Sequence, residues 1–344
     1  MTTNTAIGTQ DNDDLNPNRR AGPPTWKEEN DVIGIEEFFG FWPTEASALE
    51  WYENHRWRDG LRCPRCGGTG CYKVASGKPL SHRCRECKKY FSVKIGTPME
   101  HSNLSVRKFL LYIHFMLTES KGSSGRKMHA SLKTGLRTAW FLGQRVRRMA
   151  KDTELPLLSG LVQIDETYFG GKFKNMPKKR RKKYGGDGMA NKIAIIGAID
   201  EYGNVAVEQL LKNTNVARLD FVMTNVKPGS IVVTDGHPGY SRLSEFGYIH
   251  KVVIHEDGQY VDEEGFTTNA IEGHWSQLKR KYHGVHHYLP AKNAQRYLDE
   301  STFRNNLGPG NGPKTIGLLL DMAEGRTLPW KELVNSKPAV WDRR

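Results

Sequence analysis

Two adjacent carboxylates interrupt the strand-like stretch Leu161-Val162-Gln163-Ile164-Asp165-Glu166-Thr167-Tyr168-Phe169-Gly170. Its β-branched and aromatic residues, its lack of proline and the two glycines at its end predict a β-strand. Side chains alternate between the faces of a strand, so Asp165 shares a face with Gln163 and Phe169, and Glu166 points away from it. A carboxylate among large apolar side chains is costly unless it is paired or binds a metal. We therefore predict that Asp165 is a metal ligand on the central strand of a catalytic sheet; a strand end frayed into solvent is the alternative.

A second carboxylate follows a short apolar strand. Residues 230–234 contain the run Ile231-Val232-Val233, which is typical of a strand buried in a parallel sheet, and the strand ends at Asp235-Gly236. The carboxyl end of such a strand is where α/β sheets place their site residues. Asp235 is therefore a candidate ligand, and an ordinary Asp-Gly turn is the alternative.

A third carboxylate lies at the start of a predicted helix, in Thr268-Asn269-Ala270-Ile271-Glu272. Glu272 could project across the sheet toward Asp165 and Asp235. Alternatively, Asn269 and Glu272 could form a capping box, with Glu272 as the N3 partner. Lys279 follows seven residues later, which is two helical turns and almost the same face. A carboxylate and a lysine on one helix face suit a phosphodiester site, with one group for metal and the other for phosphate.

The segments between these carboxylates predict the rest of the sheet. Residues 192–199 and 205–211 form a hairpin around a glycine turn, and residues 217–225 form a helix. The resulting order of strand, hairpin, helix, strand and helix is the ribonuclease-H-like pattern. Residues 172–183 hold eight Lys or Arg and no acid. We expect a flexible basic loop there that contacts a DNA backbone through Lys178, Lys179, Arg180 and Arg181.

Four of the five cysteines have the spacing of a structural metal site: Cys63, Cys66, Cys84 and Cys87. Two C-x2-C knuckles joined by a hairpin bring four thiolates into a tetrahedron, which suits one structural Zn²⁺. The metal contributes folding energy directly in so small a module. Cys71 lies outside the pattern, and we interpret it as a spare thiol in the hairpin.

The segment from Ser105 to Lys151 is basic and helical, with 11 Lys or Arg against the single acid Glu119. A helix capped by Ser105, a second helix after a Gly-Ser-Ser turn and a third helix over residues 136–150 are typical of a helix-turn-helix. A three-helix bundle with a solvated basic face is the alternative. The candidate DNA contacts in this segment are Arg126, Lys127, Arg137, Thr138, Gln144 and Arg145.

Composition supports a nucleic-acid partner. Of the 344 residues, 51 are Lys or Arg and 38 are Asp or Glu, which gives a formal net charge of +13 that is unevenly spread. No run of 18 apolar residues and no signal-peptide core is present, so we expect a soluble, cytoplasmic, nucleoid-associated protein. The expected organisation is a disordered arm (1–30), a zinc ribbon with a preceding helix (31–100), a helix-turn-helix (101–152), a catalytic domain (158–310) and a C-terminal tail (311–344). In that tail, residues 316–320 could dock a helix, and Trp330 and Trp341 could pack or mediate assembly.

Together these motifs resemble the DDE insertion-sequence transposases that carry an N-terminal zinc ribbon, the ISXO-like group. The resemblance covers residues 35–306 and rests on the two cysteine knuckles, on 164–171, 234–237 and 268–275 with Lys279-Arg280, and on 297–300 with 303–306. It implies that Asp165, Asp235 and Glu272 form the catalytic triad and that Lys279 contacts phosphate. Some families of this kind use a different third residue, so Asn269 and His274 remain rivals of Glu272.

The resemblance also implies a reaction. Three carboxylates can hold two Mg²⁺ or Mn²⁺ ions about 4 Å apart, and such ions support cleavage at the ends of a mobile element followed by strand transfer. Double-stranded DNA is then the partner, and a homodimer or larger assembly is expected because two ends must be held together. Two other classes stay open: a host-adopted DNA-binding protein without catalysis, and a ribonuclease-H-like nuclease that acts on RNA or hybrids.

Overall fold

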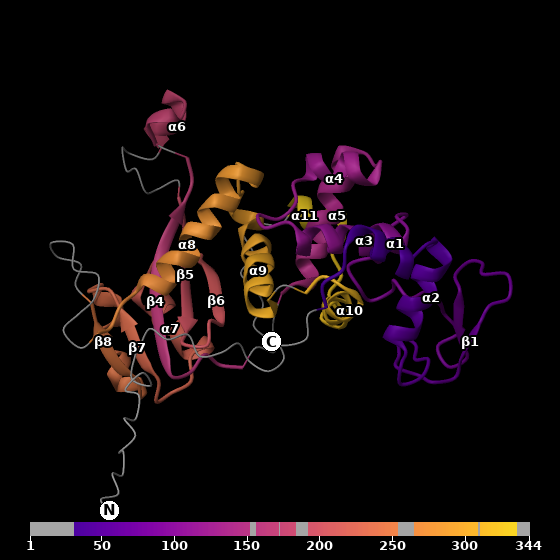
Figure 1. Cartoon of the computed structure of the whole chain (residues 1–344), viewed down its shortest axis with the longest axis horizontal. Coiled ribbons are helices and arrows are strands. Elements are labelled where there is room, and N and C mark those ends of the chain that lie inside the picture. The colour runs from indigo at the N-terminus through magenta and orange to yellow at the C-terminus, as the bar shows by residue number, and fades with distance from the viewer. Residues whose placement is uncertain are drawn as a thin grey trace, which may run out of the picture.

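The computed structural model describes residues 31–151, 156–171, 173–183, 192–253, 265–308 and 310–335. The predicted arm at 1–30 and Trp341 lie outside these ranges. A five-stranded sheet occupies one end of the molecule, a small zinc-ribbon sheet the other end, and helices fill the space between them (Figure 1). No helix of the described ranges is long and apolar enough to cross a membrane.

The large sheet has the ribonuclease-H-like strand order β6-β5-β4-β7-β8. Its strands are β4 (Leu161–Phe169), β5 (Ile193–Asp200), β6 (Val205–Leu210), β7 (Ile231–Thr234) and β8 (Ile249–Val252). The hairpin strand β5 is antiparallel to both β4 and β6, whereas β7 is parallel to β4 and to β8. The predicted hairpin, the buried strand β7 and the central position of β4 are confirmed. Strand β8 was not predicted.

Helices cover both faces of this sheet. Helix α7 (Asn215–Asn225) packs on one face, in a core that contains Val162 and Ile164 of β4. Helices α8 (Asn269–Lys281) and α9 (Ala291–Leu307) pack on the other face, in a core that contains Phe169. The predicted alternation along β4 is therefore confirmed, and Asp165 lies on the α8 face of the central strand.

Amide side chains of α9 satisfy the outer edge of β6. The Asn306 side chain accepts a hydrogen bond from the backbone N–H of Val205 at 2.8 Å and donates one to the backbone carbonyl of Val205 at 2.9 Å. Gln295 accepts from Gln209 N at 2.8 Å and donates to Val207 O at 3.1 Å. An edge strand with free backbone groups invites pairing with another chain, and these amides remove that liability.

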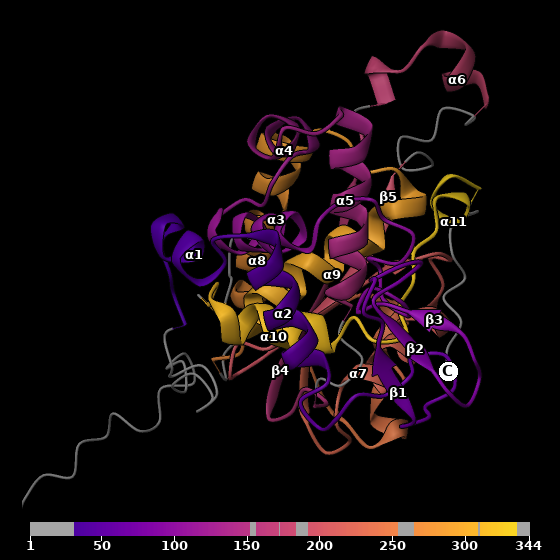
Figure 2. The same cartoon turned by 90° about the vertical axis from the view of Figure 1, so that its right-hand side faces the viewer.

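The N-terminal helices form a second core. It comprises α1 (Ile35–Phe41), α2 (Glu45–Arg56), α3 (Val106–Thr118), α4 (Gly125–Leu132), α5 (Leu136–Met149) and the later helix α10 (Pro313–Asp321). Thr44, Ser105 and Ser124 cap α2, α3 and α4 with their hydroxyl groups. Helix α10 of the tail lies beside α2 and α3 (Figure 2), so residues 316–320 dock within the same chain.

A buried ion pair joins this helical body to the sheet domain. Arg147 of α5 donates to Glu300 of α9 at 2.6 Å, and both side chains are about 4% exposed. The Arg147 guanidinium also lies over the ring of Tyr297 at 4.1 Å, and Gln144 donates to the Tyr297 hydroxyl at 3.0 Å. Because an unpaired buried charge is costly, these contacts hold the two bodies in one arrangement.

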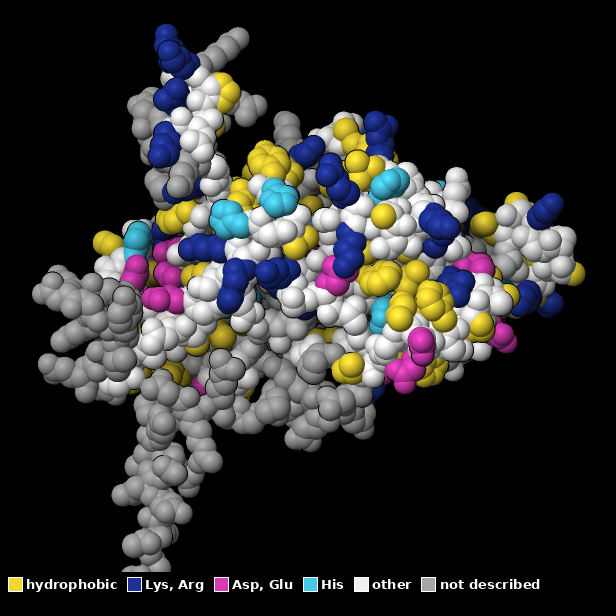
Figure 3. Space-filling model, turned by 45° about the horizontal axis from the view of Figure 1, so that its top comes forward, with side chains coloured by type: hydrophobic (Ala, Val, Ile, Leu, Met, Phe, Trp, Pro, Cys, Tyr) yellow, Lys and Arg dark blue, Asp and Glu magenta, His cyan; other side chains and the backbone are white. Residues whose placement is uncertain are grey.

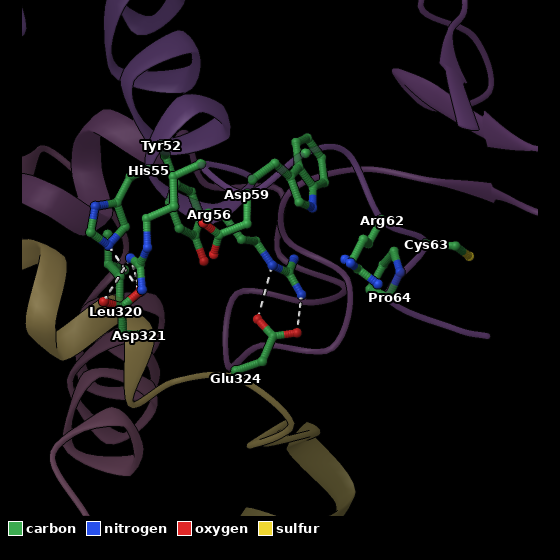
Figure 4. Close-up of a pocket in the computed structure, with 13 residues that line it drawn as sticks. Tyr52, His55, Arg56, Asp59, Arg62, Cys63, Pro64, Leu320, Asp321 and Glu324 are labelled. Carbon is green, nitrogen blue, oxygen red and sulfur yellow. Dashed lines mark hydrogen bonds and ion pairs between the residues drawn. The ribbon is translucent and has the colours of Figure 1, made fainter. Parts of the chain in front are cut away.

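A polar cavity of about 370 Å³ lies where the tail meets the zinc-ribbon side of the molecule (Figure 4). Arg56 of α2 makes two hydrogen bonds to Glu324, at 2.9 and 2.5 Å. His55 and Arg58 both contact Asp321 at 3.0 Å. These ion pairs join α2 and Arg58, which follows it, to α10 and the turn that follows α10.

Candidate active site and zinc centre

The carboxylates Asp165, Glu166 and Asp235 form one cluster, in which one oxygen of each lies within 4.8 Å of the others. Glu166 and Asp165 lie on opposite faces of β4, as predicted, but the prediction did not anticipate that their carboxylate oxygens approach each other this closely. Strand β7 pairs with β4 only as far as Gln163, so the edge of β4 is open beside Asp165 and Glu166. Asp235 follows β7 directly, and all three carboxylates meet at this open edge.

Glu166 is held by two buried partners on the α7 face. Its Oε1 atom accepts two hydrogen bonds, one from Arg218 Nε at 2.5 Å and one from the Tyr240 hydroxyl at 2.5 Å. Arg218 is 2% exposed and Tyr240 is fully buried. Burial, reinforced by the charge of Glu166, raises the pKa of Tyr240 well above its ordinary value, so the hydroxyl remains a donor. The charge of Glu166 is thus balanced within the protein.

Asp165 is held from the opposite face by α8. The indole Nε1 of Trp275 donates to Oδ2 of Asp165 at 3.0 Å. Gly197 is the partner of Asp165 on β5, and a Cβ atom there would lie 2.5 Å from the Trp275 ring. Burial, together with the charges of Asp235 and Glu166, raises the pKa of Asp165 to about 6. A bound cation would relieve this cost.

Asp235 lies in a tight turn after β7. Its Oδ1 atom accepts a hydrogen bond from the backbone N–H of His237 at 3.1 Å. The Nδ1 atom of His237 in turn accepts a hydrogen bond from the backbone N–H of Gly239 at 2.9 Å. The Asp235 side chain therefore shapes its own turn, and it also belongs to the carboxylate cluster. The two interpretations of Asp235 made from the sequence are compatible.

Helix α8 begins at Asn269, with Thr268 as its N-cap residue. The alternative of a capping box with Asn269 as N-cap and Glu272 at N3 is therefore wrong, because Glu272 is the fourth residue of the helix. The cap comes from the sheet instead: Oε1 of Gln163 accepts from Ala270 N at 2.9 Å and from Ile271 N at 3.3 Å. Those N–H groups have no partner within their own helix.

The first turn of α8 carries Glu272, half-buried, with the Thr268 hydroxyl donating to it at 3.3 Å. Within the described residues the carboxylate cluster does not include Glu272. Glu272 lies one helical turn before Trp275, whose side chain donates a hydrogen bond to Asp165. Lys279 is exposed and lies two helical turns after Glu272.

The two rivals of Glu272 differ from it in exposure. Asn269 is exposed at the first position of α8. His274 is 5% exposed, and burial lowers its pKa to about 4, so its ring is neutral. Among the described residues, no group of carboxylates surrounds His274 that could share a metal with it.

The donor atoms of the cluster fit a hard divalent cation. Carboxylate oxygens are the ligands that Mg²⁺ and Mn²⁺ prefer. The charge of Asp235 adds to the cost of ionising Asp165, while Arg218 already balances Glu166. A cation bound between Asp165 and Asp235 would offset that cost.

The zinc ribbon contains β1 (Cys71–Lys73), β2 (His82–Cys84) and β3 (Tyr90–Phe91) in one small sheet. The sulfurs of Cys63, Cys66, Cys84 and Cys87 lie within 4.8 Å of one another, with Cys63–Cys87 and Cys66–Cys84 both at 3.7 Å. A tetrahedron with Zn–S bonds of about 2.3 Å has edges of about 3.8 Å, so the four thiols fit Zn²⁺.

Backbone N–H groups of Cys87 and Glu86 lower the pKa of Cys84 to about 7, which favours the thiolate. Cys71 pairs with Cys84 across the sheet and is outside the sulfur cluster.

The predicted DNA contacts divide into two groups. Arg126, Lys127, Arg137 and Thr138 are exposed on α4 and at the start of α5. By contrast, Arg145 is 4% exposed with its guanidinium 4.2 Å from the Phe141 ring, and Gln144 is fully buried against α9. Only the first turn of α5 is exposed to solvent, because most side chains from Ala139 onward are buried. We therefore leave Gln144 and Arg145 out of the proposed contacts.

The basic run after β4 also differs from its prediction. Residues Lys178–Lys183 form a short helix, α6, which projects from the sheet, whereas a flexible loop was expected (Figure 1). Lys178 is exposed and Arg181 half-buried, and the side chains of Lys179 and Arg180 lie outside the described ones. Acidic side chains gather over the sheet on the face shown in Figure 3. Lys and Arg side chains lie next to them and continue across the helices.

Sequence reasoning gave no role to five residues of the site: Gln163, Gly197, Trp275, Arg218 and Tyr240. Gln163 was assigned to the correct face of β4 but was given no role. A glycine inside a strand marks a close approach of another group, and Gly197 is such a glycine. Trp275 lies one turn after Glu272, so its position on the inner face of α8 was accessible from the helical period alone.

Comparison with known proteins gives two matches to family models. Residues 157–306 match an ISXO2-like transposase domain, and residues 43–90 match a transposase zinc-ribbon domain. The chain is also similar to an uncharacterized protein in transposable element ISH50 of Halobacterium salinarum. The two are 26% identical over 290 residues, which is 81% of this chain and 97% of that protein.

Proposed function

We propose that this chain, which resembles the transposases that combine a zinc ribbon with an ISXO2-like domain, binds the ends of an insertion sequence and catalyses metal-dependent DNA cleavage and strand transfer. The observation that carries this proposal is the meeting of Asp165 and Asp235 at the open edge of β4. Both groups are ionisable oxygen donors, and the exposed Lys279 lies on α8, which packs on the face of the sheet that carries Asp165.

In the proposed site, Asp165 and Asp235 hold the catalytic ions, and Glu272 supplies the third carboxylate from α8. Bound Mg²⁺ or Mn²⁺ ions supply activation of the attacking water or 3′-hydroxyl and stabilisation of the departing oxygen. Lys279 holds the phosphate near the cluster. Glu166 has a supporting role, because Arg218 and Tyr240 already use its Oε1 atom.

DNA recognition is assigned to other parts of the chain. The exposed side chains of α4 and the first turn of α5 read the element ends, since a recognition helix contacts bases with its N-terminal residues. Residues of α6 contact the DNA backbone without regard to sequence. We propose that the chain works as a homodimer or larger assembly on DNA, because both ends of an element must be processed together, and that it acts at the nucleoid.

A cleavage and strand-transfer assay with the terminal repeats of the encoding element tests this proposal. Wild-type protein should cleave and join these ends with Mg²⁺ or Mn²⁺, and Asp165→Asn and Asp235→Asn should bind the ends without cleaving them. End binding without any cleavage by wild-type protein would favour a DNA-binding protein that lacks catalysis. Cleavage of an RNA–DNA hybrid in preference to duplex ends would favour a nuclease.

A further inference from the structure

We propose that Trp275 is a positioning residue for Asp165, and that Gly197 is required because it admits the Trp275 indole to that position. The inference rests on the proposed function, in that Asp165 is taken to hold a metal ion. It adds a residue that contacts neither metal nor DNA and acts through the orientation of one carboxylate.

The geometry involves three different elements. Trp275 is on the inner face of α8 and only 3% exposed, and its Nε1 donates to Oδ2 of Asp165 at 3.0 Å. Gly197 lies opposite Asp165 in the β4–β5 ladder. A Cβ atom at position 197 would lie 2.5 and 2.9 Å from two carbons of the Trp275 ring, and 3.3 Å from Ile271. Any other residue at position 197 would therefore displace the indole or the strand.

The hydrogen bond matters because Asp165 has negatively charged neighbours. Asp235 and Glu166 each have an oxygen within 4.8 Å of it, and a free carboxylate would rotate away from them. The indole N–H donates to Oδ2 and so fixes the orientation of the Asp165 carboxylate. Tryptophan can only donate here, so it stabilises the ionised form that a metal requires. A hydrogen bond to a charged group is worth about 1.5–3 kcal/mol, which corresponds to about tenfold to hundredfold in metal affinity.

The first test measures the Mn²⁺ concentration that gives half-maximal cleavage. Trp275→Phe keeps an aromatic ring in the core but removes the N–H, and it should raise that concentration about tenfold to hundredfold. Gly197→Ala keeps the indole but pushes it from its position, and it should have the same effect. Gly273→Ala is the matched control, because nothing lies within 4 Å of a Cβ on this exposed residue of α8. Thermal unfolding should show that all three variants are folded.

A second measurement is independent of activity. In protein carrying ¹⁵N-labelled tryptophan, Trp275→Phe identifies the indole signal of Trp275. Substoichiometric Mn²⁺ should broaden that signal and leave those of Trp140 and Trp330 sharp, because these two residues lie in the helical body. Gly197→Ala should require about tenfold to hundredfold more Mn²⁺ for the same broadening.

The outcomes separate the inference from the proposed function. If Mn²⁺ broadens the Trp275 signal in wild-type protein but folded Trp275→Phe and Gly197→Ala cleave with unchanged Mn²⁺ requirement, the positioning role is overturned and the metal site stands. If Mn²⁺ leaves the Trp275 signal sharp and no cleavage occurs, the metal site itself is absent and both proposals fall.

Discussion

Gln163, in the central strand, accepts hydrogen bonds from the free N–H groups at the start of α8, of which the shortest is 2.9 Å to Ala270. Two residues after Gln163 comes Asp165, and two residues after Ala270 comes Glu272. The Gln163 side chain therefore ties the start of the helix that carries Glu272 to the strand that carries Asp165.

Replacement of Gln163 by Met should impair both stability and catalysis. Met has a similar volume but no strong acceptor, so the cap of α8 is lost at a cost of about 1 kcal/mol in the free energy of unfolding. Strand transfer should fall more than this loss of stability explains, because Glu272 moves with the helix. Thr44→Ala removes a cap of similar strength from α2, away from the site, and should leave the cleavage rate of folded protein unchanged. Equal activity of Gln163→Met and Thr44→Ala would contradict this role for Gln163.

Glu166→Gln and Glu272→Gln should have opposite effects on stability and activity. Glu166→Gln leaves Arg218 buried without its charged partner, so urea denaturation should show a loss of about 3–5 kcal/mol in the free energy of unfolding. Glu272→Gln should leave stability nearly unchanged and remove cleavage as thoroughly as Asp165→Asn, since groups that act as a unit are not additive. A stable Glu166→Gln protein without cleavage, beside an active Glu272→Gln protein, would identify Glu166 as the third ligand.

The zinc ribbon should hold one zinc ion per chain by elemental analysis. Cys84→Ser should lose this zinc and unfold the ribbon locally, because one of four ligands is missing and the metal supplies folding energy. Cys71→Ser changes a cysteine of the same sheet that is outside the sulfur cluster and should retain full zinc. Zinc at full stoichiometry in Cys84→Ser would contradict the assignment of the ligands.

The exposed Arg137 and the buried Arg145 of α5 should behave differently. Arg137→Ala should reduce the preference for end DNA over random duplex by about 1–3 kcal/mol in competition binding. Arg145→Ala should lower the unfolding temperature and leave that preference intact, because its guanidinium lies over Phe141 in the interior. If Arg145→Ala loses end recognition while remaining fully stable, α5 must be exposed in the DNA complex.

Deletion of residues 105–151 is not a useful test of DNA recognition. Helices α3 and α5 supply much of the N-terminal core, and Arg147 joins that core to α9, so the deletion would unfold the protein.

Lys178→Ala at the start of α6 is a better probe of contact with the DNA backbone. It should weaken binding to all duplexes alike and reduce the salt dependence of log K by about one.

Local patterns in the sequence were sufficient for most elements of this protein. The cysteine spacing predicts the zinc site, the Ser105 cap predicts the start of α3, and the alternation along β4 predicts its two faces. These features depend on residues a few positions apart, where the period of a helix or strand and the reach of one side chain settle the outcome. The order of carboxylates between elements likewise predicted the ribonuclease-H-like sheet.

The arrangement of the site depended on contacts between distant residues. Glu166 approaches Asp235 because the pairing of β7 with β4 stops at Gln163, and no periodicity in β4 contains that information. Gln144 is buried because α5 packs against α9, whose Tyr297 is 153 residues from Gln144. The cap of α8 comes from Gln163, which precedes Ala270 by 107 residues. Burial and hydrogen-bond partners of this kind are set by how whole elements pack, so only the tertiary structure could decide them.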